Sequence, residues 1–129
     1  MYTMQEAFEI MCKHIFEQGV QSTNGKSGGD CYCLYRGPNG LKCVIGALIP
    51  DSEYKPEYDI KIGMSVDYLY SEGITCLSGL RLDFLEEMQS IHDDGDWSTS
   101  DAMRNAFMKT GTYYGLETHF LKELNFSDR

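Results

Sequence analysis

The residues of this chain best suited to metal chemistry are its five cysteines and three histidines. Cys31 and Cys33 form a Cys-x-Cys pair, a spacing that zinc sites use. The side chains available to complete such a site are Cys43, His14, His92 and His119. Structural zinc is usually held by two close pairs of ligands, and this chain has only one. We therefore predict ordinary small, buried cysteines and no bound metal or cofactor.

Cys43 is also the candidate for thiol catalysis. A thiol enzyme needs a cysteine with a lowered pKa and an imidazole base held by a carboxylate. Cys43 follows Lys42 directly, and His92 is followed by Asp93. The competing interpretation makes Cys43 a buried, inert thiol and His92 a residue that interacts favourably with a helix C-terminus. We keep a thiol-dependent enzyme as an alternative function.

A third set of residues has the chemistry of a binding surface. Two cations lie on either side of a turn at residues 37–40, and interface hot spots favour Trp, Tyr and Arg. The candidate binding residues are Tyr35, Arg36, Asn39, Lys42 and Trp97. They are suited to a partner protein, or to a small anionic ligand such as a nucleotide. In the simpler alternative, Arg36 only braces the turn by hydrogen bonding to carbonyl groups.

The element that must position most of these residues is residues 31–45. Residues 31–36 and 41–45 alternate in the manner of strands, and Gly-Pro-Asn-Gly lies between them. We predict a β-hairpin over about 31–45. After Ile45, both a strand end and a single buried helical turn fit residues 46–49. The polar loop at 21–30 contains Gly25-Lys26-Ser27, but it lacks the earlier glycine and the flanking elements of a nucleotide-binding loop.

Helices are predicted on both sides of the hairpin. Thr3 and Glu6 form a capping box, and Gly19 is a natural helix end. Ser65 and Ser78 are predicted to cap two further helices, and residues 98–101 form a second capping box. Another helix is predicted at 116–124. The chain is thus predicted to be a single α+β domain over 1–129, with four or five helices around one hairpin.

Charge and hydropathy narrow the classes of partner. The net charge is −9, and the 11 basic residues are spread along the chain, so direct binding of nucleic acid is not expected. No apolar run is long enough to span a bilayer, and the first residues lack the pattern of a secretory signal. We expect a cytoplasmic protein with reduced cysteines. The composition leaves its oligomeric state open.

The amino-acid sequence of the predicted hairpin resembles the sequences of a family of small phage and prophage proteins. The shared strings are Tyr-Arg-Gly-Pro at 35–38, Gly-Leu-Lys-Cys at 40–43 and Leu-Ile-Pro-Asp at 48–51, and the similarity extends to Ile-His-Asp at 91–93. No activity follows from this resemblance. It implies a phage setting in a bacterial host cytosol, where small acidic proteins often bind and block a host factor such as a defence component. A non-enzymatic host-interaction protein is therefore our preferred prediction.

Overall fold

The structure of the protein is a computed structural model that describes residues 1–26, 31–59 and 65–127. These residues form six α-helices and three short 3-10 helices. The α-helices are α1 (Met4–Gln18), α2 (Val44–Leu48), α3 (Val66–Ser71), α4 (Thr75–Ser78), α5 (Leu82–Asp94) and α6 (Ser100–Tyr113), and the 3-10 helices are η2 (Pro38–Gly40), η3 (Pro56–Tyr58) and η4 (His119–Glu123). Part of the predicted loop at 21–30 lies outside the described residues.

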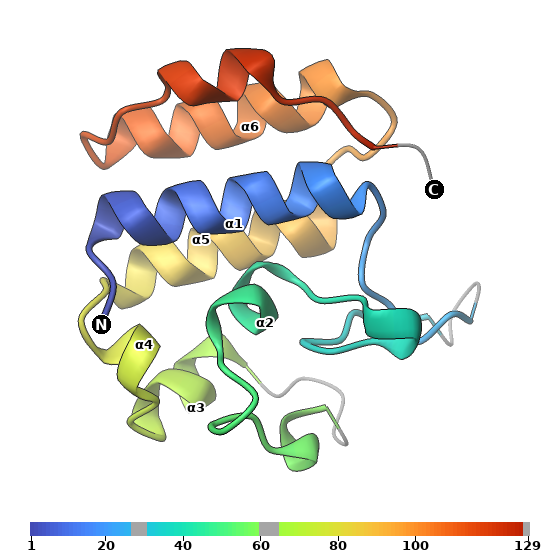
Figure 1. Ribbon diagram of the computed structural model, residues 1–129, viewed down its shortest axis with the longest axis vertical. Helices are drawn as coiled ribbons and strands as arrows, with labels where there is room; N and C mark the ends of the chain where they lie inside the picture. Colours follow the sequence, from blue (N-terminus) through green and yellow to red (C-terminus); the bar gives the residue numbers. More distant parts are fainter. Residues whose placement is uncertain (27–30, 60–64, 128–129) are drawn as a thin grey trace.

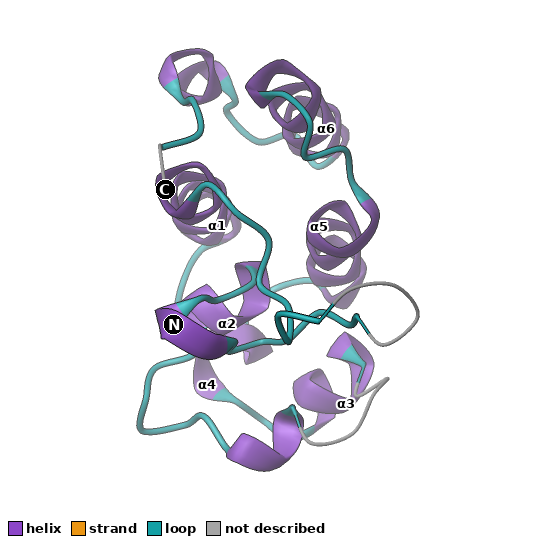
Figure 2. Cartoon of the chain, turned by 90° about the vertical axis from the view of Figure 1, so that its right-hand side faces the viewer, coloured by secondary structure: helices purple, strands orange, loops and turns teal. Residues whose placement is uncertain are grey.

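The helices are arranged in three levels. α6 and the segment that carries η4 lie at one end, α1 and α5 lie side by side in the middle, and α2, α3 and α4 lie at the other end (Figures 1 and 2). α5 contacts α2, α3 and α6, so it connects all three levels. None of the helices in the described part of the chain is long and apolar enough to cross a bilayer.

The prediction for the first helix is confirmed. The Thr3 hydroxyl accepts a hydrogen bond from the Glu6 amide at 3.1 Å, and the Glu6 carboxylate accepts one from the Thr3 amide at 2.9 Å. Gly19 ends the helix in the left-handed conformation, with φ 77°. An N-cap such as Thr3 stabilises the helix by about 1 kcal/mol. Each of these signals depends only on residues next to the helix end that it marks, which explains why the sequence alone was sufficient.

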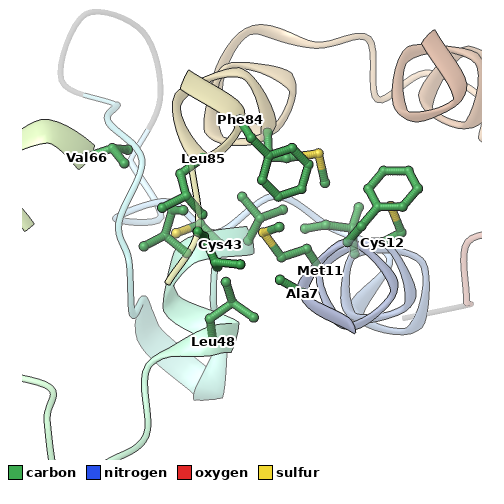
Figure 3. Close-up of a cluster of buried hydrophobic side chains, with 14 of the residues drawn as sticks. Ala7, Met11, Cys12, Cys43, Leu48, Val66, Phe84 and Leu85 are labelled. Carbon is green, nitrogen blue, oxygen red and sulfur yellow. The ribbon is translucent and has the colours of Figure 1, made fainter. Parts of the chain in front are cut away.

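The core lies mainly between α1, α2 and α5. Figure 3 shows side chains from these three helices meeting in one apolar cluster. Their apolar positions recur at helical spacing, so each helix presents one apolar face to the others. Those labelled in the figure that are completely buried are Ala7, Met11, Cys12, Cys43, Phe84 and Leu85.

The predicted β-hairpin, and with it the α+β class, is wrong. Within the described residues there is no strand, only two isolated antiparallel bridges, Thr23–Cys33 and Arg36–Lys42. The chain does turn back at 37–40, where Asn39 and Gly40 have φ angles of 61° and 78°. Beyond the second bridge it leaves the extended conformation, because Val44–Leu48 form α2. The alternative of a single buried helical turn was the better interpretation.

Two tertiary contacts explain the absence of a hairpin. The amides of Tyr35 and Arg36 donate to the two carboxylate oxygens of Asp59, at 2.8 and 3.0 Å, rather than to a neighbouring strand. Gly46 in α2 lies directly on the backbone of Tyr35, so that a Cβ at this position would come within 1.9 Å of the Tyr35 carbonyl oxygen. The two backbones therefore approach closely at Gly46, where a larger residue would not fit.

The remaining helix boundaries are partly as predicted. Ser65 caps α3 through the amide of Tyr68. Ser78 does not cap α5, because it ends α4 and donates to the Thr75 carbonyl instead. Thr99, not Ser98, caps α6. The predicted last helix is reduced to the 3-10 turn η4. α5 instead begins after Arg81, which makes no side-chain capping bond, so a hydroxyl residue near a helix does not by itself fix where the helix begins.

Candidate functional site

Cys43 occupies the N-cap position of α2. Its sulfur accepts a hydrogen bond from the Gly46 amide at 3.3 Å, and its side chain is completely buried. Burial raises the pKa of the Cys43 thiol to about 12. This is the opposite of the shift that a nucleophilic cysteine needs. Cys43 therefore acts as a capping and packing residue.

The thiol that lies beside His92 and Asp93 is Cys33. One ligand atom from each of these three residues lies within 4.8 Å of the other two. Cys33 comes from the segment before the turn, and the other two residues come from the last turn of α5. The sequence analysis paired His92 with Cys43, because nothing in the local pattern shows that residues 33 and 92 meet.

Both ring nitrogens of His92 are engaged. The ring is completely buried, its Nδ1 lies 2.8 Å from Asp93 Oδ1, and its Nε2 lies 3.1 Å from the amide of Ser22. Because the Ser22 amide can only donate, Nε2 accepts, and the proton is on Nδ1 and is donated to Asp93. In this arrangement His92 has no free nitrogen with which to act as a general base.

Asp93 is the common acceptor of the cluster. Its Oδ1 also accepts a hydrogen bond from Gln89 Nε2 at 2.9 Å. Burial and then the negative charge of Asp93 raise the pKa of the Cys33 thiol to about 12. A neutral thiol, a neutral imidazole and an exposed carboxylate do not form a thiolate–imidazolium pair.

Gln21 and Trp97 attach this cluster to the rest of the fold. The Gln21 side-chain amide donates to the carbonyls of His92 and Asp93, at 2.8 and 3.1 Å, and to Cys33 Sγ at 3.4 Å. The Trp97 indole donates to the His92 carbonyl at 2.9 Å. We call the set the polar junction; it consists of Gln21, Ser22, Cys33, Gln89, His92, Asp93 and Trp97.

The polar junction was only partly visible in the sequence. The sequence offered Cys33, His92, Asp93 and Trp97 as candidates, but for different sites. It did not indicate Gln21, Ser22 or Gln89. Ser22 and Gln89 are buried polar residues, at 0% and 8% exposure. A buried glutamine on the apolar side of a helix is the one signal that pointed to a polar partner.

Arg36 is held against the protein. Its guanidinium lies 2.6 Å from Asp51, donates to the Ile49 carbonyl at 2.8 Å, and lies over the ring of Tyr54, 4.4 Å from the centroid. In the alternative interpretation of the sequence, Arg36 braces the turn at 37–40 through carbonyl groups. Arg36 does bond a carbonyl, but it is that of Ile49, after α2, and not one of the turn. Two of its guanidinium nitrogens have acceptors, and its buried Nε has none among the described residues.

Four of the five predicted binding residues lie on one turned segment, where Arg36 and Lys42 form a bridge, but their side chains differ in exposure. Tyr35 is buried, and Asn39 is exposed at the turn. The Lys42 backbone bonds to His14 and Gln18 of α1. Trp97 stacks on Phe126, with a centroid distance of 5.7 Å, and belongs to the polar junction.

Asp59 is a structural residue that the sequence analysis missed. Besides the two backbone amides, it accepts a hydrogen bond from the Tyr54 hydroxyl at 2.5 Å. Burial, and then this hydrogen bond and the charge of Asp59, raise the pKa of Tyr54. Asp59 lies 23 and 24 residues from the amides that it binds, so no local pattern announces it.

A groove of about 520 Å³ opens between α5 and α6, on a different part of α5. It is lined by Asp83, Glu87, Lys109, Thr110, Tyr113 and Tyr114. Tyr113 is 79% exposed. A shallower hollow is lined by Met108, Lys109, Thr112 and Tyr113. Tyr113 and Lys109 thus line both hollows.

The remaining candidate zinc ligands are dispersed. The His14 ring lies 2.9 Å from the Lys42 carbonyl, to which it donates, and burial lowers its pKa. His119 is exposed at the start of η4. Cys31 is exposed, and Cys12 and Cys76 are buried.

Comparison of the chain with models of protein families, with curated proteins and with solved structures finds no match. The resemblance to a phage family accordingly stays a prediction. Inferences about function rest on the geometry described above.

Proposed function

We propose that the protein acts without catalysis, by binding a partner protein on the surface between α5 and α6. The observation that carries this proposal is the 79% exposed side chain of Tyr113, which lines both hollows. Leaving a large aromatic side chain in water gives up the free energy of burying it. A partner that covers it recovers this free energy.

The chemistry of the groove suits a protein partner. Tyr113 and Tyr114 form an edge-to-face pair, with centroids 4.9 Å apart, and offer rigid aromatic area. Lys109, Asp83 and Glu87 supply charges around this pair. Aromatic anchors surrounded by polar groups are the usual composition of an interface hot spot.

The charge of the protein favours a basic partner. A net charge of −9 on 129 residues produces an attractive field for a basic surface and speeds its association. The phage setting implied by the resemblance adds a biological expectation. On that basis the partner is a host protein of a bacterium, such as a component of a defence system, and binding blocks it.

The cysteine geometry supports a non-enzymatic function. Cys43 is buried with a raised pKa, and the thiol beside His92 also has a raised pKa. His92 has both nitrogens engaged in hydrogen bonds. A thiol-dependent enzyme would need the reverse of each of these properties.

The experiment is a pull-down from host lysate with the tagged full-length protein and two matched variants. Tyr113→Ala removes the exposed aromatic ring from the groove, whereas Tyr68→Ala removes a tyrosine of α3 that is 44% exposed. We expect one specific partner to be retained by the wild type and by Tyr68→Ala, and to be lost with Tyr113→Ala. The affinity of this partner should also fall as the salt concentration rises.

Two outcomes would contradict the proposal. The first is the absence of a specific partner under several salt and lysate conditions. The second is a partner that Tyr113→Ala and Lys109→Ala bind as tightly as the wild type does. In the second case the protein would bind through another face.

A further inference from the structure

We propose that Cys33, His92 and Asp93 form a binding site for a divalent cation of the zinc class. Their ligand atoms, a sulfur, an imidazole nitrogen and a carboxylate oxygen, lie within 4.8 Å of one another. These are the ligand types of protein zinc sites, which hold sulfur at about 2.3 Å and nitrogen or oxygen at about 2.0–2.2 Å. Ligands bound at those lengths lie about 3–4 Å apart, so only small movements are needed. This inference does not depend on the proposed function.

Gln89 is an independent observation at the same place. It is 8% exposed, and its Oε1 has no hydrogen-bond partner among the described residues. Nε2 of the same amide lies 2.9 Å from Asp93 Oδ1, so the amide group lies directly against the cluster. A buried oxygen without a donor is costly, so the fold beside the cluster has an unmet polar requirement.

Cys31 is available for a further ligand position. It is exposed, lies two residues before Cys33, and is close enough to affect the ionisation of Cys33. Pairs of this spacing are used by zinc sites. His92 was one of the residues that the sequence offered to complete a site at this pair, although no bound metal was predicted. The fold brings the end of α5, with its imidazole and carboxylate, against Cys33.

Binding changes protonation at two residues. The Cys33 thiol loses its proton to solvent, and the sulfur becomes an anionic ligand. The His92 proton moves from Nδ1, where the metal binds, to Nε2. A proton on Nε2 displaces the Ser22 amide from its 3.1 Å hydrogen bond. Metal binding at this site therefore has a specific signature at the Ser22 amide.

The experiment is a titration of the reduced full-length protein with Zn²⁺, in competition with a chromophoric chelator. We expect one zinc ion per chain. Cys33→Ser and Asp93→Asn should each weaken binding at least about tenfold, because loss of a ligand costs no less than loss of an outer-shell partner. With Co²⁺ as the probe, the wild type should show a thiolate-to-metal charge-transfer band that Cys33→Ser lacks.

Matched controls test the position of the site. Asp94→Asn removes the neighbouring carboxylate with the same change of charge, and Cys76→Ser removes a thiol elsewhere in the fold; both should bind zinc within about twofold of the wild type. In an amide spectrum, Zn²⁺ should shift the Ser22 signal. Because His92→Gln alters a buried residue and can prevent folding, the test uses the two more accessible ligands.

Three results would overturn the inference. One is the absence of stoichiometric zinc binding to folded, reduced protein. Another is unchanged affinity in both Cys33→Ser and Asp93→Asn. The last is an equal loss in Asp94→Asn, which would indicate a diffuse attraction of cations to an acidic protein.

Discussion

The two ends of α5 differ in how they use polar residues. At the C-terminal end, His92 and Gln89 are buried, and His92 has a hydrogen-bond partner on each ring nitrogen. At the N-terminal end, Asp83 and Glu87 line an open groove beside an exposed Tyr113. Groups of the first kind hold the fold together, because removing one leaves its partners unpaired in the interior. Groups of the second kind are available to a partner at little cost to stability.

The largest expected effect of burial is on thiol reactivity, which should differ between buried Cys43 and exposed Cys31. Cys43 has a pKa of about 12, whereas an unfolded cysteine has one of about 8.5. At pH 8 we expect Cys43 to be alkylated at least about a thousandfold more slowly in the native protein than in urea. Mass spectrometry after timed alkylation measures this, with exposed Cys31 as the internal control. Equal labelling of Cys31 and Cys43 in the native protein would contradict the burial of Cys43.

The next effect is the loss of the buried imidazole. His92→Ala leaves the Ser22 amide without an acceptor, frees Asp93 from one donor and opens a cavity. We expect the free energy of unfolding to fall by about 3 kcal/mol, measured by urea denaturation. His119→Ala, on an exposed turn, is the control and should change it by less than about 0.5 kcal/mol. Similar values for both variants would mean that the hydrogen bonds of His92, at the C-terminal end of α5, add no stability.

A smaller effect isolates one hydrogen bond of the polar junction. Trp97→Phe keeps an aromatic ring against Phe126 but removes the donor to the His92 carbonyl. Because Gln21 still donates to the same carbonyl, we expect a loss of about 1 kcal/mol. Denaturation of the double variant with Gln21→Ala should show a loss larger than the sum of the two single losses. If the losses in the free energy of unfolding were strictly additive, Trp97 and Gln21 would not substitute for each other as donors to the His92 carbonyl.

The smallest effect is expected in the groove. Tyr113→Ala should change the free energy of unfolding by less than about 0.5 kcal/mol, since the side chain is 79% exposed. The measurement is the same urea titration, with Phe84→Ala, which removes a buried ring of α5, as the opposite case. A loss above about 2 kcal/mol in Tyr113→Ala would show that this residue supports the fold and is not reserved for a partner.

The sequence by itself determined the elements whose signals are local. The capping box at Thr3 and Glu6, the Gly19 stop and the Ser65 cap all depend on residues within one or two helical turns. The apolar spacing that places Phe84, Met88 and Ile91 in the core could be read in the same way. The net charge and the composition are likewise properties of the sequence alone.

Tertiary structure alone decided the segment at 31–45 and the site. Strand-like alternation there was overridden because Asp59 binds the amides of Tyr35 and Arg36, and because Gly46 allows α2 to pack directly on Tyr35. Cys33 meets His92 across 59 positions of sequence, a contact set by how α5 packs and not by any motif. A local pattern can specify which groups are polar or apolar, but packing determines which of them meet.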